Sequence, residues 1–108
     1  MKNITQIEWE ALIENNDNDA VIIDCRTPDE WRTGVIENAN MMNIQDPQSF
    51  MDGVNKLDKD KNHFVYCRSG VRSVQACQVL ESVGINATYN LLGGILDWEG
   101  KTVLPSSY

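Results

Sequence analysis

The sequence has few of the residues that hold metals or build disulfide frameworks. It contains three cysteines, Cys25, Cys67 and Cys77, and a single histidine, His63. An odd number of cysteines in a chain without an export signal argues against a disulfide framework. Neither a Cys-x-x-Cys pair nor a second histidine accompanies His63, so a zinc site has no support. We therefore expect neither a metal nor another cofactor.

Positive charge is also scarce, and long apolar runs are missing. Lys and Arg number 9 against 16 Asp and Glu, which gives a net charge of −7. This balance argues against nucleic acid and anionic membranes as partners, because both need a basic face. No apolar run is long enough to span a bilayer, and residues 1–6 lack the apolar stretch of a signal peptide. We expect a cytoplasmic protein that binds neither nucleic acid nor membranes.

What the chain does contain suits one folded domain over residues 1–108. Hydrophobic residues make up 42% of it, in short runs that alternate with patterns of helical spacing. Strands alternating with helices imply parallel pairing and an α/β layered fold. Strands are expected over 20–23, 41–44, 63–66 and 88–92, and the tail 105–108 is expected to fray. Helices are expected after Thr5, Thr27 and Asp46, between the Cys67 region and Gly84, and around Trp98.

Cys67 stands where a predicted strand runs into a loop that opens a helix. In open α/β sheets, reactive groups gather at the carboxyl ends of the strands. The unpaired N–H groups of residues 68–72 can converge there, and the helix dipole reinforces them as an anion-binding nest. A thiolate in such a nest is stabilised relative to the thiol. We therefore expect Cys67 to be a nucleophile with a lowered pKa.

Two arginines accompany this loop. Helix dipoles favour acids in the first turn, yet Arg72 is placed there, with Arg68 just before it. Positive charge at this point makes sense if the site holds a thiolate and receives an anionic substrate. The candidate site therefore consists of Cys67 as the catalytic residue and a substrate-binding loop formed by Arg68, Ser69, Gly70, Val71 and Arg72.

Three stretches of the chain resemble the signatures of rhodanese-like sulfurtransferases. Residues 67–73, Cys-Arg-Ser-Gly-Val-Arg-Ser, are similar to the active-site loop of single-domain members. Residues 24–34, which begin Asp-Cys-Arg-Thr-Pro-Asp-Glu-Trp, resemble the first signature, and residues 92–98 resemble the C-terminal one. Val35 and Gln45 depart from the family pattern, which often has His and Pro there. The resemblance covers nearly the whole chain.

The resemblance implies a rhodanese-like three-layer sandwich, with a central parallel sheet of about five strands flanked by helices. It also implies a double-displacement reaction with ping-pong kinetics. The Cys67 thiolate would take a sulfane sulfur from a small anionic donor, such as thiosulfate or a persulfide, and hold it as a persulfide. A thiol, a protein thiol or cyanide would then accept it. Arg68 and Arg72 would attract the donor.

Two other functions stay open at this point. A Cys-dependent phosphatase or arsenate reductase needs the same thiolate and amides, but places one more residue between the cysteine and the arginine. Here four residues separate Cys67 from Arg72, and this tighter loop favours a sulfur atom over a tetrahedral phosphate. A non-catalytic interaction module would keep the fold and lose the activity. The presence of Cys67 with both arginines argues against that reading.

Cys25 is expected to fill a core position, and Cys77 to be in the core or half-exposed, since a free cysteine behaves as a small apolar residue. For Cys25 the alternative is a resolving thiol, because it follows a strand that can neighbour the strand of Cys67. Cys77 lies on a helix face.

A charged cluster stands around the start of the second helix. Glu30 is interpreted as the acid of a capping box. Asp24 with Arg26 is interpreted as a structural brace near the edge of the site.

Overall fold

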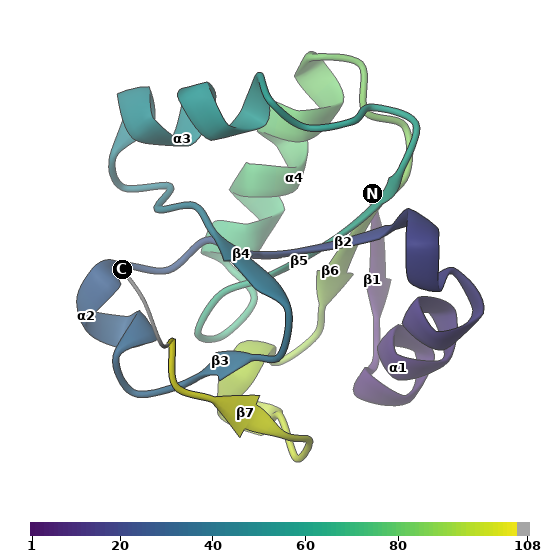
Figure 1. Cartoon of the computed structure of the whole chain (residues 1–108), viewed down its shortest axis with the longest axis vertical. Helices are drawn as coiled ribbons and strands as arrows, with labels where there is room; N and C mark the ends of the chain where they lie inside the picture. Colours follow the sequence, from purple (N-terminus) through teal and green to yellow (C-terminus); the bar gives the residue numbers. More distant parts are fainter. Residues whose placement is uncertain (106–108) are drawn as a thin grey trace.

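A five-stranded parallel sheet runs through the middle of the molecule (Figure 1). The computed structural model describes residues 1–105. The strand order is β1-β6-β5-β2-β4, and every neighbouring pair is parallel, as the sequence predicts. The strands are β1 (Lys2–Ile4), β2 (Ala20–Asp24), β4 (Ala39–Met41), β5 (Asn62–Tyr66) and β6 (Thr88–Leu91). A separate antiparallel pair joins β3 (Val35–Ile36) to β7 (Thr102–Val103).

Helices cover both faces of the sheet, which confirms the predicted layered α/β fold. They are α1 (Gln6–Asn15), α2 (Pro28–Trp31), α3 (Pro47–Val54) and α4 (Arg72–Ser82), with 3-10 turns η1 (Asp17–Asp19) and η2 (Gly94–Asp97). Figure 1 shows α3 and α4 on one side of the sheet and α1 on the other. Within residues 1–105, none of the helices has the length and apolar character needed to cross a membrane.

Local sequence signals set the helix starts. Thr5 caps α1 as predicted: its N–H donates to the Glu8 carboxylate at 3.1 Å, and the Glu8 N–H donates back to Thr5 Oγ1 at 3.3 Å. Thr27 and Glu30 form the same capping box at α2. Asp46 caps α3 by accepting from the Ser49 N–H. Each cap satisfies N–H groups that the first helical turn leaves unpaired.

The core has two halves, one on each face of the sheet. On the α3/α4 face, Phe50 and Val54 pack with Ala76 and Leu80. On the α1 face, Trp9 is 1% exposed and packs against aromatic residues of the sheet. Cys25, Cys67 and Cys77 all lie in the α3/α4 half. The expected core placement of Cys25 is confirmed, and Cys77, expected in the core or half-exposed, is buried.

Several short elements differ from the sequence prediction. The strand expected over 41–44 is β4, Ala39–Met41, because its partner β2 ends at Asp24, which pairs with Met41. The helix expected around Trp98 is the 3-10 turn η2, which ends before it. Strands β1, β3 and β7 were not predicted, because each has only two or three residues. Residues 106–108, most of the tail expected to fray, lie outside the described residues.

Candidate active site

Cys67 lies at the carboxyl edge of the sheet, directly after β5. Its neighbour β2 ends at Asp24, which pairs in register with Tyr66. One residue further along, the Cys25 N–H donates to the Tyr66 carbonyl at 3.1 Å. The two strand ends therefore carry Cys25 and Cys67 side by side. Cys25 is 0% and Cys67 1% exposed.

The loop of residues 67–72, called the Cys67 loop below, folds its backbone around the cysteine. Gly70 has a φ of +100°, a conformation that glycine adopts without steric cost. This turns the Gly70 N–H inward, where it donates to Cys67 Sγ at 3.1 Å. The side chains of Arg68, Ser69 and Val71 are exposed. The loop thus brings backbone, rather than those three side chains, to the sulfur.

A buried polar chain supports the loop from behind. Ser73 Oγ lies within hydrogen-bond distance of two acceptors, Cys67 Sγ at 3.3 Å and Asn90 Oδ1 at 2.5 Å, and its single proton serves one of them at a time. The Asn90 amide nitrogen in turn donates to the Gly70 carbonyl at 3.4 Å and to Asn3 Oδ1 at 3.0 Å. The sequence prediction gave no role to Ser73 or Asn90. The signal for Asn90 is a polar residue inside an otherwise buried strand, because buried polar groups need partners.

These contacts favour the ionised form of Cys67. Hydrogen bonds from the Cys25 thiol, from the Ser73 hydroxyl and from the backbone of Ser73 and Gly70 lower the pKa of Cys67 to about 4, although burial opposes them. The pKa of Cys25 moves strongly upward, because Cys25 donates to Cys67, is buried, and lies near the charges of Cys67 and Asp24. At neutral pH the pair is therefore one thiolate and one protonated thiol.

Arg72 is held by α2 rather than projecting freely toward a substrate. Its two terminal nitrogens donate to the two carboxylate oxygens of Glu30 at 2.7 and 2.8 Å. The hydrogen bonds from Arg72 are the main cause that lowers the pKa of Glu30 to about 2, with further bonds from Thr27. Glu30 therefore has a second role besides the predicted capping box. The pair ties the first turn of α4 to α2 with the geometry of a bidentate ion pair.

Asp24 and Arg26 form the predicted brace. Arg26 donates to both carboxylate oxygens of Asp24, at 2.7 Å for the shortest bond, and to the Gly34 carbonyl at 2.7 Å. The Trp31 indole also donates to Asp24, at 3.2 Å. Arg26 is 3% and Asp24 0% exposed, so this is a buried, fully hydrogen-bonded pair.

The C-terminal signature, residues 92–98, forms backbone hydrogen bonds with the Cys67 loop. The Ile95 N–H donates to the Cys67 carbonyl at 3.0 Å, and the Leu96 N–H donates to the Arg68 carbonyl at 3.1 Å. A Cβ at Gly94 would lie 2.4 Å from the Arg68 oxygen, so a larger residue would push the loop away. Glycine at this position therefore permits the close approach of two backbones.

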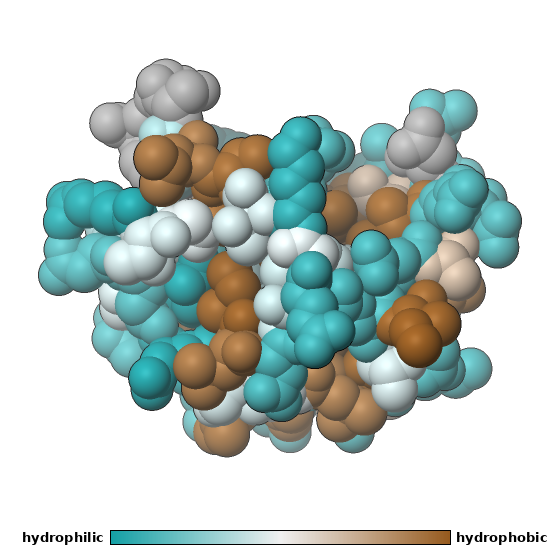
Figure 2. All heavy atoms as spheres, turned by 90° about the horizontal axis from the view of Figure 1, so that it is seen from below, coloured by the Kyte–Doolittle hydropathy of each residue, from teal (hydrophilic) through white to brown (hydrophobic). Residues whose placement is uncertain are grey.

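A hollow of about 440 Å³ adjoins the loop. Arg68, Leu96 and Glu30 are among its lining residues. Two large apolar side chains of this region are exposed: Val71 of the Cys67 loop is 69% exposed, and Leu96, which lines the hollow, is 58% exposed. Figure 2 shows apolar side chains in separate patches among polar ones on the face seen from below. The site region therefore offers both charge and apolar surface.

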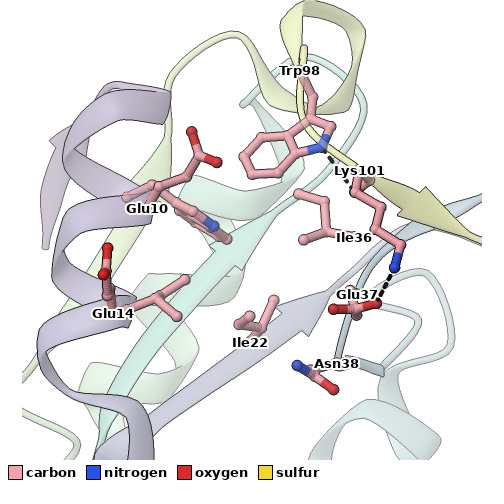
Figure 3. Close-up of a pocket in the computed structure, with 10 residues that line it drawn as sticks. Glu10, Glu14, Ile22, Ile36, Glu37, Asn38, Trp98 and Lys101 are labelled. Atoms are coloured by element: carbon pink, nitrogen blue, oxygen red, sulfur yellow. Dashed lines mark hydrogen bonds and ion pairs between the residues drawn. The ribbon is translucent and has the colours of Figure 1, made fainter.

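A second hollow, of about 330 Å³, is lined by α1 on the opposite face of the sheet (Figure 3). Glu10 and Glu14 come from α1, and Trp98 and Lys101 come from the C-terminal segment. Lys101 Nζ forms an ion pair with Glu37 at 3.0 Å. No residue of the Cys67 loop lines this hollow, so it is separate from the candidate site.

Known proteins resemble this chain over nearly its full length. The family model described as "Rhodanese-like domain" matches residues 6–101. A sulfurtransferase of Allochromatium vinosum is 35% identical over 98 residues, which cover 88% of each chain. YtwF of Bacillus subtilis, provisionally named a sulfurtransferase, is 37% identical and matches 92% of this chain and 94% of its own. The crystal structure of a rhodanese-like domain protein from Staphylococcus aureus has a TM-score of 0.82 and 29% identity, covering 98% of this chain and all of its own.

Proposed function

The chain belongs to the rhodanese-like domain family, and on that premise we propose that it is a sulfurtransferase that carries sulfur as a persulfide on Cys67. The observation that supports this most directly is the environment of Cys67 Sγ. A hydrogen bond from the Gly70 N–H and the lowered pKa of Cys67 favour a thiolate nucleophile. Sulfur transfer needs such a nucleophile and neither a metal nor a cofactor.

The first half-reaction loads the enzyme. The Cys67 thiolate attacks the terminal sulfur of an anionic donor such as thiosulfate. A bond forms between the two sulfur atoms, the S–S bond of thiosulfate breaks, and sulfite leaves with the electron pair. Since Cys67 is only 1% exposed, a single terminal sulfur atom fits this approach better than a bulky phosphate ester. The backbone around Sγ would stabilise the charge of the bound sulfur.

The second half-reaction unloads it. An acceptor thiolate attacks the outer sulfur, the persulfide S–S bond breaks, and Cys67 leaves as a thiolate. Its lowered pKa makes Cys67 a good leaving group. The exposed Arg68 would attract the anionic donor, and the exposed side chains of Val71 and Leu96 would suit a thiol presented by a protein.

The test is intact-protein mass spectrometry of the reduced chain after incubation with thiosulfate. We expect a gain of one sulfur atom that cyanide or a small thiol removes. The Cys67→Ser variant should gain nothing, and Cys77→Ser, which removes another buried cysteine, should load as the wild type does. If neither thiosulfate nor a small-molecule persulfide loads Cys67, the proposal is wrong. An interaction module that retains the fold would then be the better explanation.

A further inference from the structure

The end of the β2–β5 ladder places two cysteines side by side on adjacent strands. The last register pair is Asp24 with Tyr66, and Cys25 and Cys67 follow one step beyond. Adjacent strands lie about 4.7–4.9 Å apart, and disulfides need a Cα separation of about 4.4–6.8 Å. Both cysteines pack in the core cluster on the α3/α4 face, so their side chains lie on the same side of the sheet.

The charge states of the two sulfur groups are coupled. Cys25 is the largest influence that lowers the pKa of Cys67, and both cysteines are free thiols. Cys77 is equally buried, but its Sγ faces the Tyr89 carbonyl at 4.0 Å, so it offers a matched comparison. The persulfide half-reactions form no bond to the Cys25 sulfur, which affects them only through the pKa of Cys67, and the brace around Asp24 does not include it.

We propose that Cys25 is a resolving thiol, which closes a disulfide with Cys67 after a peroxide has oxidised Cys67 to a sulfenic acid. This reaction is distinct from sulfur transfer. The one element that it shares with the proposed function is the Cys67 thiolate. The thiolate attacks one peroxide oxygen, the O–O bond breaks, and hydroxide leaves. The Cys25 sulfur then attacks Cys67 Sγ, the S–O bond breaks, and the oxygen leaves with the Cys25 proton as water. The two thiols lose two electrons, which reduce the peroxide.

The charge on Cys67 controls when Cys25 can react. In the reduced pair, the hydrogen bond to Cys67, burial and the neighbouring negative charges hold the proton on Cys25. Cys25 therefore does not compete with Cys67 for substrates. A sulfenic acid at Cys67 is neutral, which removes the thiolate charge from beside Cys25. The resulting disulfide would protect Cys67, because a sulfenic acid that finds no thiol continues to the irreversible sulfinic acid.

The test treats the reduced full-length chain with hydrogen peroxide and maps the products by intact and peptide mass spectrometry. We expect the wild type to lose the mass of two hydrogen atoms, with a Cys25–Cys67 crosslink that dithiothreitol reverses. In Cys25→Ser, Cys67 should instead gain two or three oxygen atoms irreversibly. Cys77→Ser should behave as the wild type. A wild type that gains oxygen on Cys67 without the crosslink, or crosslinks through Cys77, overturns the proposal.

The same samples separate this inference from the proposed function. Sulfur loading is measured on one aliquot, and peroxide treatment is applied to another. Loading without the crosslink overturns only the resolving role of Cys25, and the crosslink without loading counts only against sulfur transfer. If Cys25→Ser does not fold, the peptide map of the wild type alone still decides between a crosslink and a sulfinic acid.

Discussion

The two faces of the sheet are built for different tasks. On the α3/α4 face, Cys67 lies at a strand end among hydrogen-bond donors that come from the loop, from α4 and from the neighbouring strand. On the α1 face, Trp9 makes edge-on contacts with Phe64 and Tyr66, with ring centroids 5.5 and 6.2 Å apart. The first face orients polar groups toward one atom, and the second fills volume. Reactivity here therefore depends on directional contacts at a strand end, and stability depends on apolar packing across the sheet.

The largest effect that separates the two faces is expected from Trp9→Ala. Removing this buried ring should lower the free energy of unfolding by about 3–5 kcal/mol, because it deletes apolar contacts and leaves a cavity. The pKa of Cys67 in the remaining folded protein should stay the same, because no hydrogen bond to the sulfur comes from α1. Urea denaturation measures the first quantity, and the pH dependence of Cys67 alkylation measures the second.

A changed alkylation midpoint in folded Trp9→Ala would contradict the division of tasks between the two faces. It would show that packing on the α1 face sets the charge of Cys67. The control is Ile7→Ala on the same helix. Ile7 is 81% exposed, so its removal should change neither the free energy of unfolding nor the alkylation midpoint.

A smaller effect is expected from Ser73→Ala on the α3/α4 face. A hydrogen bond to a charged group contributes about 1.5–3 kcal/mol, so its loss should raise the pKa of Cys67 by about one to two units. The rate of alkylation by iodoacetamide reports the thiolate, and its midpoint should move upward from about 4. Ser82→Ala is the matched control, because Ser82 lies on the same helix and donates only to the Val79 carbonyl.

The lowered pKa of Cys67 in the wild type predicts how the stability of the fold depends on pH. The folded pKa of Cys67, about 4, lies below the unfolded value of about 8.5. Its ionisation therefore stabilises the fold fully above the unfolded pKa, and this contribution is lost as pH falls toward 4. Ser73→Ala raises the folded pKa of Cys67, so the pH range between the folded and the unfolded pKa should become narrower at its acidic end. An unchanged alkylation midpoint would remove Ser73 from the group that stabilises the thiolate.

The sequence predicts what depends on neighbours in the chain. The caps of α1 and α2 follow from residue types three positions apart, and the start of α3 follows from Asp46 with Pro47 after it. The turn at Gly70 follows from a residue that tolerates positive φ. The reactive position of Cys67 follows from a strand running into a helix. These features need only local chemistry, together with the rule that reactive groups gather at strand ends.

Tertiary pairing explains what the sequence did not predict. Arg72 and Glu30 are 42 residues apart, and Ser73 and Asn90 are 17 apart, so only the assembled sheet brings them together. Arg72 was therefore predicted to attract substrate but not to bind Glu30. The close approach of Gly94 to the Cys67 loop likewise depends on how η2 packs against that loop in the folded protein. Short pairs such as β3 with β7 have too few residues to show a periodic pattern.

The smallest effect is expected from Glu10→Gln in the hollow on the α1 face. Glu10 lines that hollow, and its carboxylate accepts from the Gln6 side chain at 3.3 Å. Glu10 forms no hydrogen bond with Cys67. At physiological salt, exposed charges that lie further apart than about 8–10 Å are largely screened from each other. Persulfide loading and the alkylation midpoint should therefore match the wild type within error. A midpoint shift as large as that of Ser73→Ala would show that the acidic hollow acts on Cys67 through the sheet. An unchanged midpoint would mean that the charge state of the nucleophile is set by the donors that touch its sulfur, and not by the net acidity of the molecule.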